Sequence, residues 1–199
     1  MTTSNLAPTS DPSSPALPAW AVPASPEPDL SVVGIDKGGT LYIYGDTPAT
    51  PGPRVPALSG VLIDVTTVKL GKNSRFGPRD YLDFYLAAPI PNSRVLLRLP
   101  CGLSPNLHTG VPQMPWAVRS LLSALTTLDL QETAIKLQTT RGNQDATFFR
   151  VIPYTPDGHE LPEVRAESIG GGRDDLEIAV NRLLSLLGRP PLFTSPHDQ

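Results

Sequence analysis

The distribution of proline sets the strongest limit on what this chain can fold into. The 199 residues include 24 prolines, and eleven of these lie in the first 56 positions. Proline lacks a backbone N–H, so it is poorly tolerated in helix interiors and central strands. We therefore expect residues 1–29 to be a disordered leader and residues 46–57 to be a linker. No apolar run approaches the ~18 residues of a membrane span, so we expect no membrane partner.

Residues 30–45 contain two β-rich runs on either side of a glycine-containing turn. Leu30–Ile35 and Thr40–Tyr44 flank Asp36–Gly39, which is typical of a β-hairpin. The string Gly34–Thr40 also resembles the first phosphate-binding hairpin of the sugar kinase and actin-like ATPase superfamily. That superfamily needs two large α/β domains and further nucleotide motifs, which this sequence lacks. A hairpin turn explains the same residues, and we expect no nucleotide turnover.

Residues 58–152 contain a regular series of amphipathic segments. Three strands are followed by a helix that begins near Pro115 and carries leucines at helical spacing. Two more strands complete the series. The expected strands are Leu58–Leu70, Tyr81–Ala88, Arg94–Leu99, Thr133–Thr140 and Ala146–Ile152, and the expected helix covers residues 115–128. This order matches the OB-fold, a five-stranded Greek-key barrel with a helix between its third and fourth strands. An α+β meander with one covering helix is the alternative.

The predicted fold class is α+β, mainly β. It consists of an OB-like barrel over residues 58–152, an added N-terminal hairpin and a C-terminal helix. Residues 153–173 are expected to form a loop, residues 174–188 the final helix and residues 189–199 a tail. Asp174 and Glu177 suit the start of that helix, and Gly188 suits its end. Its apolar stripe packs either on the barrel or in a subunit contact; the stripe comprises Leu176, Val180, Leu183 and Leu187.

Catalytic and metal-binding patterns are missing from the sequence. The three histidines fall in predicted loops, and no two of them have metal-ligand spacing. The single cysteine, Cys101, permits neither an internal disulfide nor a thiolate metal site. We therefore expect no enzyme activity, no cofactor and no metal, and a reducing, cytoplasmic location.

The charge is divided unevenly along the chain. The net charge of −3 combines acidic ends with a basic middle, because residues 53–152 hold eleven Lys and Arg but only six Asp and Glu. Strand alternation puts tyrosines and arginines on the outer face of neighbouring strands. Aromatic side chains interleaved with cations suit single-stranded nucleic acid, whose bases stack while Lys and Arg contact the phosphates. The candidate binding residues are Lys72, Arg75, Phe76, Tyr81, Tyr85, Arg94, Arg98, Lys136, Arg141, Phe148 and Arg150.

Two other interpretations of this face stay open. An antiparallel sheet commonly has one polar, solvated face with no binding role. A protein-interaction or assembly module could instead use the sheet edge, the N-terminal hairpin or the leucine-rich final helix.

The segment SGVLIDVTTVKLGKNSRFGPRDYLDFYLAAP, followed by RVLLRLPCG, a leucine-rich helix and two closing strands, resembles OB-fold single-stranded DNA-binding proteins. The resemblance covers about residues 58–152. It implies that DNA binds through strands two and three and through the loops between strands one–two and four–five. It also implies assembly into a homo-oligomer. The chain departs from the housekeeping bacterial pattern because its OB-like region is central, and the acidic, Phe-tipped tail and the stacking tryptophans of that family are missing.

Overall fold

The computed structural model describes residues 29–44, 51–70, 79–89, 93–102, 104–105, 112–131 and 133–194. The expected leader lies outside the described residues except for Asp29, which begins the first strand. The candidate residues Lys72, Arg75 and Phe76 and the end of the expected tail also lie outside them.

Within these described ranges, eight strands form one sheet in the order β10-β9-β4-β5-β6-β1-β2-β3. All neighbours in it are antiparallel except β1 and β6, which are parallel. The strands are β1 (Asp29–Ile35), β2 (Leu41–Tyr44), β3 (Pro51–Val55), β4 (Leu58–Lys69), β5 (Asp80–Ala87), β6 (Ser93–Pro100), β9 (Ala134–Arg141) and β10 (Thr147–Pro153). A separate pair is formed by β7 (Ser104–Pro105) and β8 (Pro112–Gln113), and the helices are α1 (Trp116–Leu125), the short 3₁₀ helix η1 (Asn143–Asp145) and α2 (Arg173–Leu186).

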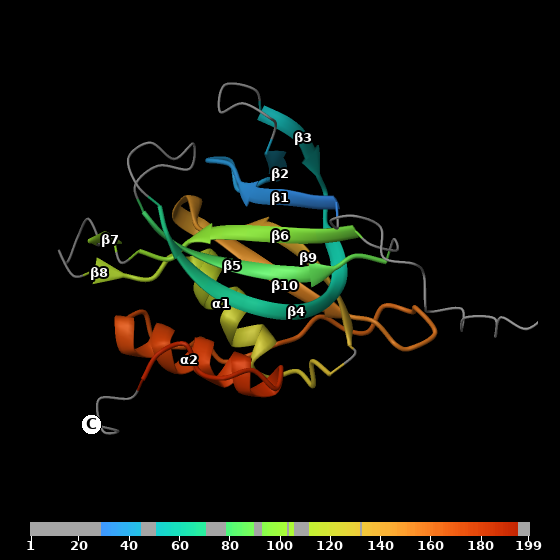
Figure 1. The fold of residues 1–199 in the computed structure, drawn as a ribbon. Helices are drawn as coiled ribbons and strands as arrows, with labels where there is room; N and C mark the ends of the chain where they lie inside the picture. Colours follow the sequence, from blue (N-terminus) through green and yellow to red (C-terminus); the bar gives the residue numbers. More distant parts are fainter. Residues whose placement is uncertain are drawn as a thin grey trace, which may run out of the picture.

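The sheet curls into a half-barrel, and β4 makes most of the bend (Figure 1). The first residues of β4 pair with β9 and the remainder pairs with β5. A register shift between Leu62 and Asp64 interrupts the alternation of β4, and such bulges bend a strand. Strict alternation predicts Val61, Ile63 and Val65 on one face. The bulge instead buries Leu62 together with Val65.

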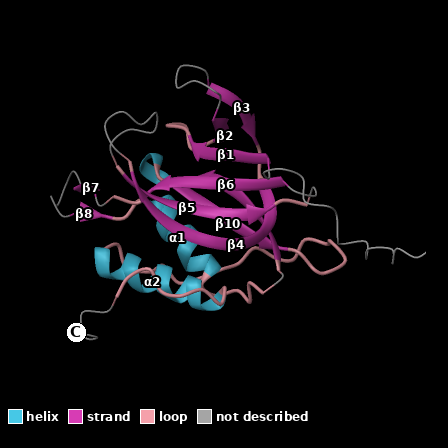
Figure 2. Cartoon of the chain, viewed as in Figure 1, coloured by secondary structure: helices cyan, strands magenta, loops and turns pink. Residues whose placement is uncertain are grey.

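Both helices lie on one side of the sheet, and α1 packs against β10 (Figure 2). The core between the helices and the sheet is mainly aliphatic, with Phe84 and Phe149 as its aromatic members, and the leucines of α1 contribute to it as their helical spacing predicts. The apolar stripe of α2 packs within the chain, with Leu176, Val180 and Leu183 in the core and Leu187 packed against it. Among the described residues, no helix is both long enough and apolar enough to cross a membrane.

The expectation of a five-stranded barrel with a separate hairpin needs correction, because the hairpin belongs to the same eight-stranded sheet. An OB barrel closes when its third strand pairs with its fifth, which here would join β6 to β10. β6 instead pairs with β1. The free edge of β10 is covered locally: the N–H of Phe149 donates to Ser120 Oγ at 2.9 Å, and the carbonyls of Val151 and Pro153 accept from the N–H groups of Val164 and Leu161. Helix α1 and residues 161–164 thus occupy the edge of β10 that β6 would need for pairing.

The expected linker 46–57 also needs correction, because it contains β3. Two prolines lie in this strand, Pro51 and Pro53. They are tolerated because β3 is the last of the described strands in the sheet, where its one neighbour is β2. Proline is confined to edge strands and bulges for lack of its N–H. Proline content alone therefore underestimated the strand content of this segment.

The string Gly34–Thr40 forms the turn of the N-terminal hairpin. Gly39 adopts a φ of +79°, which favours glycine. Asp36 Oδ1 accepts a hydrogen bond from the Thr40 N–H at 2.8 Å, and its carbonyl accepts one from the Gly39 N–H at 2.9 Å. The glycines and the aspartate thus have a structural role in the turn.

Candidate nucleic-acid interface

Tyr81, Tyr85, Arg94 and Arg98 share the face of β5 and β6 that lies opposite the core, as alternation predicts. They differ in how far solvent reaches them. Arg94 is exposed and Tyr85 is half-buried, whereas Tyr81 is only 5% exposed. Burial raises the pKa of Tyr81 above its usual value of 10. Tyr81 therefore has little ring surface available for a base.

Arg98 is engaged by a carboxylate on the neighbouring strand. Its Nε and Nη2 donate to the two carboxylate oxygens of Asp83 at 2.7 and 2.5 Å. The two residues are direct cross-strand partners, and Asp83 is fully buried. The hydrogen bond to Asp83 raises the pKa of Arg98 further above its usual value. Sequence alternation identified both positions as polar but could not show that they pair.

The other candidate strands also share a face as expected, since Lys136, Phe148 and Arg150 lie opposite the core on β9 and β10. The segment after β10 brings two acids to this face. Lys136 Nζ lies 2.6 Å from Glu160, and Arg150 Nε lies 2.7 Å from Glu163. The expected loop 153–173 thus supplies negative charge to two of the candidate cations.

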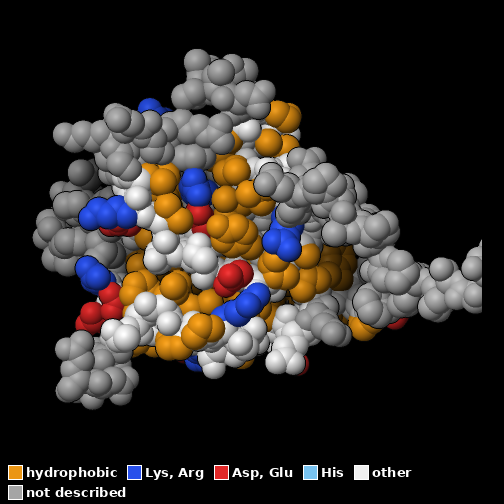
Figure 3. All heavy atoms as spheres, viewed as in Figure 1, with side chains coloured by type: hydrophobic (Ala, Val, Ile, Leu, Met, Phe, Trp, Pro, Cys, Tyr) orange, Lys and Arg blue, Asp and Glu red, His pale blue; other side chains and the backbone are white. Residues whose placement is uncertain are grey.

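Among the described residues, the basic side chains form no continuous patch on the face shown in Figure 3. Several of the Lys and Arg side chains there lie against acidic ones, with hydrophobic atoms between them. In the described part of the basic middle, Arg98, Lys136, Arg141 and Arg150 therefore each have a carboxylate partner that reduces the local positive charge.

A different group of side chains gathers where α1 begins beside the β9–β10 turn. The indole of Trp116 is 45% exposed, and its centroid lies 5.6 Å from that of Phe148. The guanidinium carbon of Arg119 lies 4.1 Å from the centroid of the Trp116 ring, which is a cation–π contact. We call Trp116, Arg119, Arg141, Gly142 and Phe148 the Trp116 surface.

Hydrogen bonds hold Arg119 in place beneath this cluster. Its Nη2 and Nε donate to the carbonyl of Ile169 at 2.7 and 3.2 Å, and Nη2 also reaches Ser168 Oγ at 3.1 Å. The guanidinium is therefore fixed before any ligand arrives. A rigid aromatic surface loses little conformational entropy when a ligand binds.

The β9–β10 turn supports the other side of the Trp116 surface. A side chain at Gly142 would collide with the ring of Phe148, so glycine lets the ring lie against the turn. Arg141 pairs with Asp145 at 3.2 Å, and both side chains are more than half exposed. Such an exposed pair is weak and can be exchanged for another anion.

Two hollows adjoin Trp116. One, of about 520 Å³, is lined by the β9–β10 turn and Phe148, and the other, of about 270 Å³, lies between α1 and the end of β1. The turn of the N-terminal hairpin is also close, since a side chain at Gly39 would meet Thr147 Oγ1 at 2.7 Å. The exposed indole therefore stands between two concave regions at one end of the sheet.

Sequence reasoning included Phe148 and Arg141 but missed Trp116 and Arg119. These two appeared as ordinary residues of the first helical turn. The position of Trp116 in the helix could have identified it. The leucines of this helix already form its buried stripe, so an aromatic ring outside the stripe is expected to face solvent.

Within the described residues, no group of three or more His, Cys, Asp or Glu could hold a metal ion. Comparison of the chain with protein-family models, with curated proteins and with solved structures found no match.

Proposed function

We propose that the protein is a non-catalytic module that binds single-stranded nucleic acid, with DNA favoured, and that the Trp116 surface is its main contact. The observation that carries the proposal is the exposed indole of Trp116, packed against Phe148 and Arg119 and flanked by two hollows. Bases stack on such rings whatever their sequence. The β9–β10 turn beside it corresponds in order to the loop between strands four and five of an OB-fold.

The distribution of charge supports this proposal with only a few contacts to phosphates. Arg141 and Arg94 are exposed and can reach phosphates, whereas Arg98 is engaged by buried Asp83. Lys136 and Arg150 become available only when Glu160 and Glu163 are displaced. We therefore expect few phosphate contacts and a modest dependence of affinity on salt.

The test is fluorescence anisotropy with labelled dT oligonucleotides, matched duplex and RNA at two salt concentrations. We expect dT to bind in preference to duplex. Trp116→Ala should weaken binding about 5- to 100-fold, which corresponds to the loss of one stacking contact. Ile178→Ala is the matched control, because Ile178 on α2 is 68% exposed and lies outside the Trp116 surface. Equal affinity of wild type and Trp116→Ala would remove the Trp116 surface from the proposal.

A protein-binding module is the second candidate, and the ion pairs favour it. Arg98, Lys136 and Arg150 all have carboxylate partners, which reduces the positive charge open to phosphates. An exposed tryptophan beside an arginine is also a common anchor of protein interfaces. No binding of any nucleic acid at low salt would favour this candidate. A pull-down comparing wild type with Trp116→Ala would then test it.

A further inference from the structure

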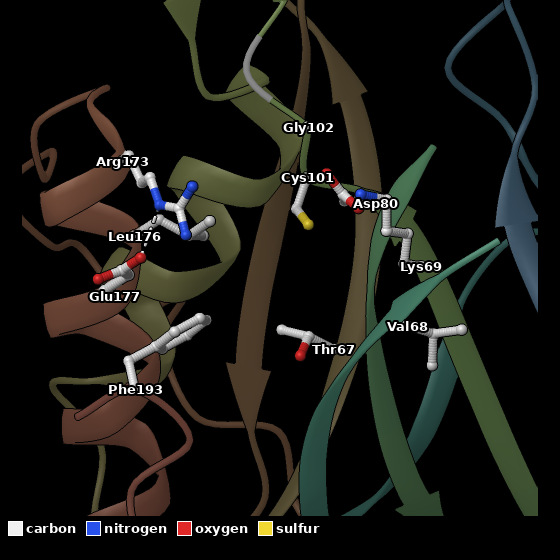
Figure 4. Close-up of a pocket in the computed structure, with 10 residues that line it drawn as sticks. All are labelled: Thr67, Val68, Lys69, Asp80, Cys101, Gly102, Arg173, Leu176, Glu177 and Phe193. Carbon is white, nitrogen blue, oxygen red and sulfur yellow. Dashed lines mark hydrogen bonds and ion pairs between the residues drawn. The ribbon is translucent and has the colours of Figure 1, made fainter. Parts of the chain in front are cut away.

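A third cavity lies between the end of the β4–β5 pair and α2, and it shares no lining residue with the two hollows beside Trp116. It measures about 430 Å³. Figure 4 shows its lining, with Arg173 and Glu177 of α2 on one side and Lys69 and Asp80 of the strands on the other. The sulfur of Cys101, which follows β6, lies between these two sides (Figure 4).

The chain after α2 folds back to form one wall of the cavity. Gly188 adopts a φ of +66°, which lets the chain reverse direction. The side chain of Asn181 then holds the returning segment. Its Oδ1 accepts from the N–H groups of Leu192 and Phe193 at 3.0 and 3.1 Å, and its Nδ2 donates to the Phe193 carbonyl at 2.7 Å. These three bonds hold the backbone of the returning segment, and the Phe193 ring lines the cavity.

The deeper part of the cavity is apolar. Leu176 and Cys101 are buried, and Phe193 faces them. Burial raises the pKa of the Cys101 thiol to about 12, so the sulfur stays protonated at neutral pH. A neutral, buried thiol behaves as a small hydrophobic group rather than as a nucleophile.

The rim carries two charges of each sign. Lys69 and Asp80 are direct partners in the β4–β5 register. Arg173 Nε donates to Glu177 Oε1 at 2.7 Å, and the Arg173 side chain is 74% exposed. This bond uses one edge of the guanidinium and leaves further N–H donors. A ligand with only negative charge would be repelled by the two carboxylates of the rim. A ligand with only positive charge would be repelled by its two basic side chains.

We propose that this cavity binds a small zwitterion with an apolar side chain, of the amino-acid type. Its carboxylate would meet Arg173 on the α2 side, its ammonium would meet Asp80 on the strand side, and its side chain would contact Phe193 and Leu176. Charge complementarity of this kind selects a ligand by rejecting those that leave one sign unpaired. A cavity of about 430 Å³ has room for roughly a dozen non-hydrogen atoms and some water, since a water molecule takes about 30 Å³.

The test uses the full chain and three related probes in ligand-observed NMR and calorimetry. L-phenylalanine carries both charges, 3-phenylpropanoate lacks the ammonium and 2-phenylethylamine lacks the carboxylate. We expect L-phenylalanine to bind with a Kd of about 0.1–10 mM, which suits so small a ligand. Each single-charge analogue should bind at least about tenfold more weakly, because one pair of rim charges is left unmatched. Absence of phenylalanine binding, or equal binding of all three probes, would overturn the proposal.

Variants then locate the site. Arg173→Gln and Asp80→Asn should each weaken phenylalanine binding about 5- to 10-fold, since each removes one ionic partner. Arg182→Gln is the matched control, because Arg182 is exposed on the same helix and does not line the cavity. If a variant fails to fold, NMR of the wild-type protein with phenylalanine still tests the location of the site. Phenylalanine must shift the NMR signals of Thr67, Cys101 and Leu176, and shifts confined to other regions would refute the assignment.

The proposed amino-acid site is independent of the proposed nucleic-acid site. Trp116 does not line the cavity, so Trp116→Ala should leave phenylalanine binding unchanged. Loss of phenylalanine binding in Trp116→Ala would place the ligand at the Trp116 surface instead.

Discussion

The carboxylate of Asp83 controls how Arg98 can be used. Asp83 is fully buried, and the Arg98 side chain is only 13% exposed. A buried charge is tolerated when its partner supplies both attraction and hydrogen bonds, and the two-point contact of Arg98 does so. Arg98 therefore joins β6 to β5, and substituting it tests the fold as well as any ligand contact. Arg94, which is exposed on the same face, is the cleaner position for a binding variant.

We predict that Asp83→Ala lowers the free energy of unfolding by about 3 kcal/mol or more, because it leaves the nearly buried Arg98 without its carboxylate. Urea unfolding followed by circular dichroism measures the change. Asp157→Ala, at an exposed turn position, is the control. The double variant Asp83→Ala/Arg98→Met should regain part of the loss, since it removes the unpaired charge as well. A midpoint in urea that does not move in Asp83→Ala would contradict the prediction.

At the scale of the elements, the edge of β10 determines whether the sheet closes. Ser120 on α1 accepts a hydrogen bond from one edge N–H of β10. Two N–H groups of the segment 161–164 donate hydrogen bonds to edge carbonyls of β10. The same segment carries Glu163, and Glu160 directly precedes it, so the backbone bonds that cover the edge also bring acids next to Lys136 and Arg150. One covering segment thus limits both the strand pairing and the charge of the outer face.

We predict that the double variant Glu160→Gln/Glu163→Gln binds dT several-fold more tightly than wild type, because Lys136 and Arg150 become free to contact phosphates. Each new phosphate contact should also steepen the slope of log affinity against log salt by about one. The free energy of unfolding should change by less than about 1 kcal/mol, since exposed ion pairs contribute little. Anisotropy titrations at several salt concentrations measure both quantities.

Glu167→Gln is the control for this pair, because Glu167 is exposed in the same connection between β10 and α2. Unchanged affinity and slope in the double variant would exclude Lys136 and Arg150 from the phosphate contacts. The Trp116 surface contains neither residue, so it is tested separately by Trp116→Ala.

For the whole molecule, the N-terminal hairpin completes the core. Val33 on β1 and Leu41 on β2 are almost fully buried in the main hydrophobic cluster, and β1 covers the edge of β6. The region 58–152 therefore shares its sheet and its core with residues outside it. This joint burial is what makes the eight strands and two helices one body of structure.

We predict that a fragment of residues 57–199 loses cooperative thermal unfolding, whereas a fragment of residues 29–199 retains it. Removing the hairpin takes away buried apolar side chains worth about 1.5–3 kcal/mol each and exposes an unpaired strand edge. Total stabilities are only about 5–15 kcal/mol, so this loss is decisive. Circular dichroism melts of both fragments measure it. A cooperative transition in 57–199 would show that the OB-like region folds alone.

Local patterns were sufficient to locate most elements. The expected strand Leu58–Leu70 corresponds to β4, and the expected helices 115–128 and 174–188 correspond to α1 and α2. Alternation also placed Tyr81 and Arg98, and separately Lys136 and Phe148, on common faces. These features depend on side-chain periodicity within one segment, which is readable from adjacent residues. The nucleic-acid function and the assembly state stay predictions.

The sequence by itself thus determined the elements, their order along the chain and the faces of single strands. The tertiary structure decided which strands are neighbours. It placed β1, and not β10, beside β6. It also decided which acid meets which base, as in Asp83–Arg98, and brought Trp116 against Phe148 although they lie far apart in the chain. The physical reason is that such contacts join residues distant in sequence. Their energies depend on burial and on competing partners, which no local pattern contains.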